Sequence, residues 1–309
     1  MKLSVVTTLY RSETHLREFY VRVTAAAALL TPHFELVLVN DGSPDASLAL
    51  ALELRRADPR VSIVDLSRNF GHHRAMMTGL AHCRGDLVFL IDCDLEEDPA
   101  LLGRFHAELQ NSEADVVYGF QDRRQGGLLK RWGGRAFYTL FNLLSDTRLP
   151  PNLCTVRLMT RRYVQSLLAH RERETLIAGL WALTGYEQVG VAITRDTRRG
   201  SSYTMARKLK TLIDGVTSFS DRPLVLVFYL GLVISFVAGA AAMYLVIRRL
   251  FFGVLLAGWP SLIVSVWLLG GLMLFCVGLL GIYLAKVFLE TKQRPYTIVR
   301  HVYGEEVEK

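Results

Sequence analysis

Residues 85–99 read GDLVFLIDCDLEEDP, and this stretch decides the fold class of the 309-residue chain. Its apolar run, residues 87–91, is typical of a strand that is buried on both faces of a sheet. Carboxylates follow directly, at Asp92, Asp94 and Glu96. Sheets built from such strands bind ligands beyond the carboxyl ends of the strands, so the acidic run marks the edge where we expect a functional site.

The same pattern continues on both sides of this stretch, where apolar runs alternate with helical segments. The strand-like runs are 3–10, 34–41, 61–67, 114–120 and 154–160, and the helical segments before residue 111 are 13–30, 45–57, 72–83 and 99–110. Near-continuous apolar strands separated by helices predict an α/β fold, with a mainly parallel, Rossmann-like sheet covered by helices on both faces.

The composition excludes some classes of protein but does not identify a binding partner. Apolar residues make up 51% of the chain and charged residues 21%, which excludes a disordered or low-complexity protein. The four cysteines have no CxxC spacing, so the sequence predicts neither a disulfide framework nor a zinc ribbon. A net charge of +7 suits nucleic acid, anionic lipid and phosphorylated substrates alike.

Two long uncharged runs lie in the C-terminal part of the sequence. No Asp, Glu, Lys or Arg occurs at 223–247 or at 250–285. Each run exceeds the roughly 20 apolar residues that span a bilayer. We therefore predict a transmembrane hairpin with helices at about 224–246 and 261–285. A buried hairpin is the alternative, although core helices rarely run so long without a polar face.

Basic residues flank the predicted hairpin on one side. Several precede the first span and follow the second, whereas the connecting loop carries only Arg248 and Arg249. The positive-inside rule then predicts an integral protein of the cytoplasmic (inner) membrane, with residues 1–222 and both termini in the cytoplasm. The N-terminal residues do not show the sequence pattern of a secretory signal peptide. Residues 204–222 include a basic amphipathic helix, which lies in the membrane interface or packs on the globular domain.

The acidic run offers ligands for a hard cation. Asp92 and Asp94, separated by one residue, project to the same side of an extended backbone and can converge on Mg2+ or Mn2+. Such an ion bridges diphosphate oxygens and offsets charge on a leaving group. An acidic turn is the ordinary alternative, but the position after a buried strand favours the functional interpretation.

A second polar cluster, VNDGSPD at 39–45, follows another apolar run. Asp41 and the glycine after it form a turn signal, and Ser43 or Asp45 can cap the next helix. Asp41 lies at the end of the strand, where it can also accept hydrogen bonds from a nucleobase. Capping and ligand binding both remain open for this cluster.

Five segments together resemble the family 2 glycosyltransferases, which have a GT-A fold. They are TLYRSE at 8–13, VNDGSPD at 39–45, RNFGHHRAMMTGL at 68–80, GDLVFLIDCDLEEDP at 85–99 and VRLMTRRYV at 156–164. Within that family, the two spans and the segment GIYLAKVFLETKQRPYTIV at 281–299 are similar to polyprenyl-phosphate glycosyltransferases, the bacterial relatives of dolichol-phosphate mannose synthase. The resemblance covers nearly the whole chain.

The resemblance implies roles for individual residues, grouped by ligand. The nucleotide-sugar set is Thr8, Tyr10, Glu13, Asp41, Asn69 and Asp92. The metal set is Asp92, Asp94 and Glu96, with Glu96 in place of the family's glutamine. The acceptor-phosphate set by resemblance is Arg157, Ser201 and Tyr203, to which we add the basic residues Arg123 and Arg199, because arginine binds phosphate bidentately. The residues implied in catalysis are Asp92, Asp94 and Arg157.

Besides Glu96, other positions depart from the family pattern, among them Thr8, Ser12, Arg199 and Gly200. His72 and His73 replace the commoner residues, and we expect no metal there because adjacent residues at a helix start point apart. Thr155 stands where many relatives carry an aspartate. A hydroxyl acceptor needs a carboxylate base, whereas a lipid monophosphate has a second pKa near about 6 and is already largely dianionic at neutral pH. Thr155 therefore favours a phosphate acceptor.

The sequence thus predicts inverting transfer of a sugar from a UDP-linked donor to polyprenyl phosphate, expected to be undecaprenyl phosphate, for modification of cell-envelope glycan or lipid. The expected partners are the nucleotide-sugar, the lipid acceptor and the membrane, but not nucleic acid; a homo-oligomer is compatible with the sequence. The predicted organisation is a GT-A domain at 1–203, an interfacial helix at 204–222, two spans within 223–286 and a cytoplasmic tail at 287–309.

Three alternatives belong to other classes of protein. A membrane-bound transferase could act on a hydroxyl of a glycan or glycolipid, which Thr155 disfavours. A non-enzymatic scaffold or transporter subunit is disfavoured because the spans carry no charges that would mark a transport path. A dinucleotide-dependent dehydrogenase is disfavoured because no GxGxxG motif follows the first strand-like run.

Overall fold

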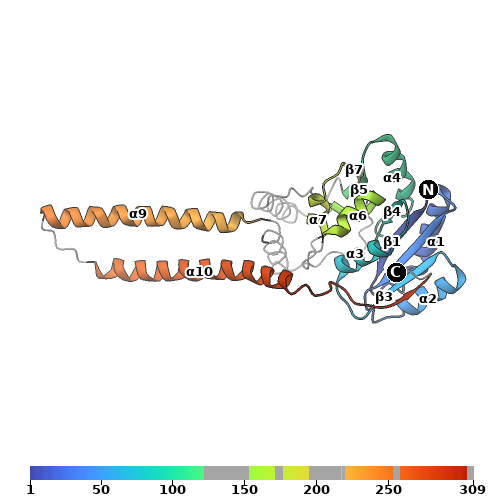
Figure 1. Ribbon diagram of the computed structural model, residues 1–309, viewed down its shortest axis with the longest axis horizontal. Helices are drawn as coiled ribbons and strands as arrows, with labels where there is room; N and C mark the ends of the chain where they lie inside the picture. Colours follow the sequence, from blue (N-terminus) through green and yellow to red (C-terminus); the bar gives the residue numbers. More distant parts are fainter. Residues whose placement is uncertain (122–152, 171–176, 195–216, 218–219, 253–257, 305–309) are drawn as a thin grey trace. The chain divides into compact units, whose positions relative to one another are not determined.

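The computed structural model describes residues 1–121, 153–170, 177–194, 217, 220–252 and 258–304. The chain divides into two compact units. The first contains the sheet with its helices and includes residues 294–304 from beyond the long apolar helices. The second contains those two helices, α9 and α10 (Figure 1).

Eight strands form the sheet of the first unit, in the order β7-β5-β6-β4-β1-β2-β3-β8. The strands are β1 (Leu3–Leu9), β2 (Phe34–Asn40), β3 (Val61–Leu66), β4 (Leu87–Leu90), β5 (Val116–Gln121), β6 (Leu153–Thr160), β7 (Gln188–Ile193) and β8 (Val299–Tyr303). The central strands β4, β1, β2 and β3 are parallel, as are β5 and β7, whereas β6 and β8 run antiparallel to their neighbours. The predicted mainly parallel sheet is confirmed.

Helices cover both faces of this sheet. They are α1 (Leu16–Leu30), α2 (Ser47–Ala57), α3 (His72–His82), α4 (Leu101–Asn111), α6 (Arg161–Ala169) and α7 (Ile177–Leu183). Side chains of α1, α2 and α4 join one core cluster with alternate residues of the strands, such as Val5. On the other face, a Cβ at Gly79 of α3 would meet Val6 and Val39. The residue there must be small, because helix and sheet approach closely.

The burial of the central strands accounts for their uninterrupted apolar sequences. All seven residues of β1 and all four of β4 are buried, as expected for central strands with helices on both faces. Each large apolar side chain buried in this way stabilises the fold by roughly 1.5–3 kcal/mol. The central position of β1 and β4 therefore follows from their uninterrupted apolar runs.

The edge strand β8 is a feature that the sequence did not predict. The segment 287–309 was expected to be a tail, yet Val299–Tyr303 pairs antiparallel with β3. Four of its five residues are exposed and the fifth is intermediate. A short edge strand with exposed side chains has no continuous apolar run to reveal it.

The second unit consists of α9 (Arg222–Phe252) and α10 (Trp259–Thr291), which run antiparallel (Figure 1). Within α10, the segment Ser265–Thr291 is long and apolar enough to cross a membrane. Its most apolar stretch has a mean hydropathy of 2.3 and contains no buried residue. It is the one such segment among the described residues; the apolar part of α9, Arg222–Ala238, is shorter. The prediction of long apolar helices in this part of the chain is therefore confirmed for α10, and a second helix of sufficient apolar length is not shown among the described residues. Apart from 217 and 220–222, the predicted interfacial helix lies outside the described residues.

Candidate functional site

The polar side chains gather at the carboxyl ends of the four central parallel strands. From β1 the chain proceeds outward through β2 and β3, whereas β4 lies on the opposite side of β1. The carboxyl ends of β1 and β4 therefore flank the point where the strand order reverses, which is the usual ligand crevice of an open parallel sheet. Thr8 lies in β1 and Asp92 follows β4, so these two predicted site residues stand on either side of it.

His72, the first residue of α3, connects the two sides of this crevice. Its Nδ1 lies 2.9 Å from Thr8 Oγ1, and its Nε2 lies 3.2 Å from Asp92 Oδ1. Desolvation lowers the pKa of His72, but the hydrogen bond to Asp92 and the charges of Asp92, Asp94 and Asp41 outweigh it, and the pKa is raised. His72 is not among the residues predicted for the site, since only the folded sheet brings its ring between these strands.

Asp41 joins the end of β2 to the loop before α3. Its carboxylate accepts hydrogen bonds from the backbone N–H of Phe70 at 2.7 Å and of Gly71 at 3.0 Å. Burial raises the pKa of Asp41, and these two hydrogen bonds act in the opposite direction. The predicted base-reading residue is only 2% exposed and supports the loop backbone. Any contact with a base therefore has to use its remaining lone pairs.

Gly42 permits this close approach of the two loops. Its φ is +59°, and a Cβ would lie 2.5 Å from both the carbonyl carbon of Arg68 and the amide nitrogen of Asn69. A side chain at this position would therefore clash with backbone atoms as well as adopt a strained conformation. The Asp41-Gly42 pair in the sequence motif follows from this requirement.

The loops after β1 and β2 are held together by reciprocal hydrogen bonds. Glu13 accepts from the backbone N–H of Ala46 at 2.9 Å, and Asp45 accepts from the backbone N–H of Glu13 at 3.2 Å. Asp45 also accepts from the backbone N–H of Ser47, the first residue of α2, although the N-cap position of this helix is Ala46, which has no side-chain capping bond. Glu13, predicted to bind the nucleotide, thus supports the loop and is itself exposed, as are Tyr10 and Asn69.

These bonds make the stability of the loop dependent on pH. Burial opposes ionisation of Asp45, but hydrogen bonds from Ser43, Ser47 and Glu13 outweigh it and lower its pKa from 3.8 to about 2. The depressed pKa stabilises the fold fully above about pH 4, and this contribution is lost as the pH falls through about 2. Because solvent screens a half-buried carboxylate, we expect Asp45→Asn to cost about 1 kcal/mol at pH 7.

Thermal unfolding of the two proteins between pH 7 and pH 2 measures this contribution. The difference between wild type and Asp45→Asn should shrink as the pH approaches 2. A difference that stays constant over this range would show that the variant acts through something other than the carboxylate charge.

The acidic run after β4 forms a turn. The strand ends at Leu90, and Leu95 has a φ of +58°. Asp94 Oδ1 accepts a hydrogen bond from the backbone N–H of Glu96 at 3.0 Å. The extended backbone assumed for Asp92 and Asp94 is therefore not found, and the two carboxylates are presented from a turn.

No group of three His, Cys, Asp or Glu side chains suited to a metal ion occurs in the part of the chain that the structure describes. The predicted metal ligands Asp92, Asp94 and Glu96 therefore do not form a complete metal site by themselves. Protein-bound Mg2+, however, is commonly held by one or two carboxylates together with substrate phosphates. The donor chemistry of Asp92 and Asp94 fits a cation whose coordination is completed by a diphosphate.

Arg157 lies next to the acidic turn but inside the protein. It sits on β6 opposite Leu90 of β4, is 1% exposed, and its guanidinium lies over the ring of Trp181. Within the described residues, its Nη1 and Nη2 have no hydrogen-bond partner. Burial lowers its pKa to about 9, with Tyr163 and Glu97 acting in the opposite direction, so the side chain stays charged at neutral pH. A buried cation is stabilised by an opposite charge nearby, and the buried Glu97 carboxylate supplies one.

The remaining predicted acceptor residues, Arg123, Arg199, Ser201 and Tyr203, lie outside the described residues. Thr155, the position of the missing aspartate, lies on β6 two residues before Arg157 and is half-buried. Its carbonyl accepts a hydrogen bond from Arg157 Nε at 3.3 Å. The structure thus brings residues predicted to bind the nucleotide close to those predicted to bind the metal. It places Arg157 near them in the sheet.

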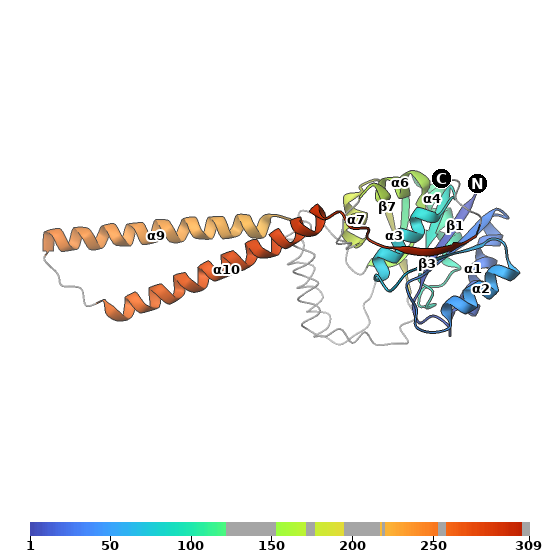
Figure 2. The same cartoon turned by 60° about the horizontal axis from the view of Figure 1, so that its bottom comes forward.

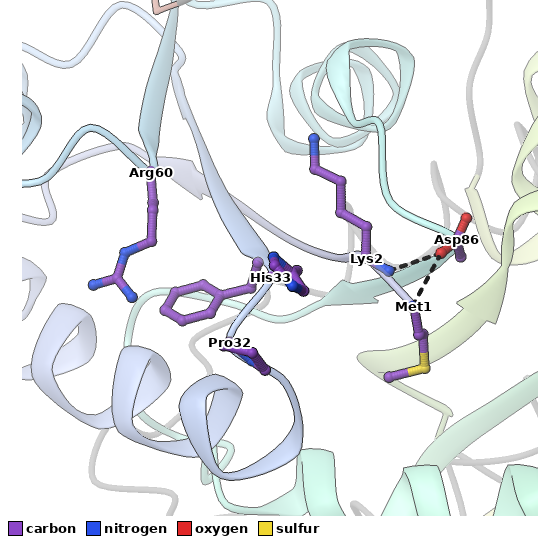
Figure 3. Close-up of a pocket in the computed structure, with 7 residues that line it drawn as sticks. Met1, Lys2, Pro32, His33, Arg60 and Asp86 are labelled. Carbon is purple, nitrogen blue, oxygen red and sulfur yellow. Dashed lines mark hydrogen bonds and ion pairs between the residues drawn. The ribbon is translucent and has the colours of Figure 1, made fainter.

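A cavity of about 500 Å³ lies at the opposite edge of the sheet (Figure 3). Its lining residues precede or begin the strands: Met1, Lys2, Pro32, His33, Phe34, Arg60 and Asp86. The terminal amino group lies 4.0 Å from the Asp86 carboxylate, which also accepts from the Lys2 backbone N–H at 2.7 Å. Because it faces the amino ends of the strands, this cavity is separate from the candidate site.

Comparisons with known proteins identify the family. The family model described as glycosyl transferase family 2 matches residues 4–168. A Mycobacterium tuberculosis protein named among the glycosyltransferases is 55% identical over 307 residues, covering 99% of this chain and 90% of that protein. The Escherichia coli prophage bactoprenol glucosyl transferase homolog is 33% identical over 304 residues, covering 98% and 99%. The crystal structure of Staphylococcus aureus TarS 1–349 aligns with a TM-score of 0.44 and 16% identity, over 71% of this chain and 65% of that one. The chain belongs to glycosyl transferase family 2.

Proposed function

We propose that the protein transfers glucose from a UDP-linked donor to the phosphate of a polyprenyl phosphate at the cytoplasmic face of the membrane. The observation that carries this proposal is the match to a bactoprenol glucosyl transferase homolog, which extends over 98% of this chain and therefore includes its apolar helices. The buried Arg157 and the exposed apolar surface of α10 support it, since they suit a phosphate and a lipid.

In this proposal the donor lies across the carboxyl ends of β1, β2 and β4. Asp41 and Asn69 contact the base, and Thr8 and Tyr10 line the nucleotide pocket. Asp92 and Asp94, with Glu96 beside them, would hold Mg2+ or Mn2+ together with the diphosphate. A cation held there would offset the negative charge that develops on the departing UDP.

The chemical step is a single displacement. An oxygen of the lipid phosphate attacks the anomeric carbon from the face opposite UDP, the new carbon–oxygen bond forms with inversion, and the electron pair of the broken bond leaves on the β-phosphate. Arg157 binds the acceptor phosphate bidentately and reduces the repulsion between two anionic reactants. No base is required at Thr155, because the lipid phosphate is already largely deprotonated at neutral pH.

The membrane arrangement proposed here has α9 and α10 as two spans, with the sheet unit and both ends of the sequence in the cytoplasm. Basic residues are concentrated outside the helix-connecting loop, in line with the positive-inside rule. The spans keep the enzyme in the bilayer where its lipid acceptor resides.

The test uses full-length protein in nanodiscs, with release of the nucleoside diphosphate (UDP or GDP) as the readout. UDP-glucose is compared with UDP-galactose, UDP-N-acetylglucosamine and GDP-mannose, each with undecaprenyl phosphate and with undecaprenol. We expect release from UDP-glucose that depends on undecaprenyl phosphate, with a lipid product of the corresponding mass. Equal turnover with undecaprenol would contradict the phosphate acceptor, and preference for another donor would contradict glucose.

A further inference from the structure

The C-terminal strap, Tyr296–Tyr303, closes the edge of the sheet beside the candidate site (dark red in Figure 2). The backbone N–H of Ser67 donates to the carbonyl of Ile298 at 2.9 Å, so the pairing extends past the end of β3. Thr297 Oγ1 lies 2.8 Å from Thr78 Oγ1 of α3. The strap therefore contacts both the strand and the helix that flank the loop at 67–71.

Arg300 occupies a bulge in the strap. Asp65 pairs with His301, and the next residue, Leu66, pairs with Val299, so Arg300 is the additional residue on this strand. Bulges of this kind re-aim a side chain and are common next to active sites. Arg300 Nη2 donates to the carbonyl oxygen of Ser67 at 2.6 Å, and Nη1 lies 3.5 Å from Asp65 Oδ2.

Asp65 transmits this contact to the loop after β2. Its carboxylate is almost fully buried, and its Oδ1 accepts a hydrogen bond from Asn40 Nδ2 at 2.7 Å. Asn40 Oδ1 in turn accepts from the backbone N–H of Ser43 at 3.2 Å. A buried carboxylate is costly without an opposite charge nearby, which Arg300 supplies. The guanidinium thus supports the loop at 41–45 through two side chains.

The second contact of Arg300 supports the loop at 67–71 directly. Ser67 begins this loop, and the N–H groups of Phe70 and Gly71 further along it donate to Asp41. Asp41 is therefore held between two loops, each of which is connected to Arg300. Moving either loop changes the position of the carboxylate proposed to read the base.

We propose that Arg300 is a positioning residue for the nucleotide-sugar, acting through Asp65 and the Ser67 carbonyl on the loops at 41–45 and 67–71. This inference rests on the proposed function, since it assigns the donor to those loops. It predicts that loss of the guanidinium weakens donor binding and leaves the acceptor site unaffected. Small displacements of binding groups have large effects, so we expect a rise of about tenfold or more in the donor KM.

The experiment compares Arg300→Ala and Arg300→Lys with His301→Ala in full-length protein in nanodiscs. His301 is an exposed neighbour on the same strand and contacts the ring of Tyr303, so its variant controls for general weakening of the strap. Hydrogen exchange of the amides at 66–72 is measured without nucleotide. Donor KM, acceptor KM and kcat are measured with UDP-glucose and undecaprenyl phosphate.

For Arg300→Ala we expect faster exchange at 66–72, a higher donor KM and an unchanged acceptor KM, with partial recovery in Arg300→Lys and wild-type behaviour in His301→Ala. A lower melting temperature with unchanged donor KM and unchanged exchange at 66–72 would overturn the proposal. Identical effects of His301→Ala and Arg300→Ala would also overturn it. If the wild-type protein turns over no donor, the proposed function fails, and the exchange at 66–72 still decides whether Arg300 holds this loop.

Discussion

Replacing Asp94 with asparagine should lower turnover by about 100-fold or more while the protein stays folded. The asparagine side chain keeps the size of aspartate and an oxygen that can accept the hydrogen bond from Glu96, which Asp94 accepts at 3.0 Å. The turn after β4 is thereby preserved. What is lost is the negative charge that we propose holds a divalent cation against the diphosphate. UDP release at saturating donor and acceptor measures the effect.

A matched control is Glu53→Gln on α2, which also exchanges a carboxylate for an amide. Glu53 is 53% exposed and pairs with Arg17 of α1 at 2.6 Å. We expect wild-type turnover from this variant. The melting temperatures of both variants should stay close to that of the wild type. An Asp94→Asn protein with full turnover would remove Asp94 from the proposed cation site.

Loss of the Arg157 guanidinium should lower kcat/KM for undecaprenyl phosphate by about 100-fold or more, because the acceptor phosphate loses a charge-assisted bidentate partner. Methionine preserves the apolar stem under the Trp181 ring. Removing this charge alone would leave the buried Glu97 carboxylate without the opposite charge that acts on it. The informative protein is therefore the double variant Arg157→Met with Glu97→Gln.

Two further measurements separate a phosphate contact from a structural role for Arg157. Binding of UDP-glucose should remain close to wild type in the double variant, since the proposed donor contacts lie on β1, in the loops after β1, β2 and β3, and in the turn after β4. Arg157→Lys should recover part of the activity, because lysine keeps the charge and loses the bidentate geometry. If the double variant binds donor normally and retains full efficiency with the lipid phosphate, the acceptor site lies elsewhere.

The buried part of the fold was predictable because its signal is local. The uninterrupted apolar runs of β1 and β4 reflect burial on both faces, and each is followed directly by polar residues at the crevice. Sequence therefore located the edge of the sheet that carries Thr8, Asp41 and Asp92. The roles of these residues toward a ligand stay predictions.

Other features depend on contacts between segments far apart in the sequence. His72 was missed because its position between Thr8 and Asp92 exists only once β1 and β4 are adjacent. The expectation for Asp92 and Asp94 assumed an extended backbone, whereas the chain turns and Leu95 adopts a positive φ. β8 was missed because its exposed residues carry no burial pattern.

The position of Arg300 in the chain has a consequence for biosynthesis. Domains generally fold as the chain emerges during synthesis, with N-terminal segments first. The loops around Asp41 are made early, but the arginine that supports them is made only after α9 and α10. The proposed donor site would therefore reach its final geometry only after both apolar helices have left the ribosome. A nascent enzyme would gain full affinity for its sugar donor only once the segments that reach its lipid acceptor have been synthesised.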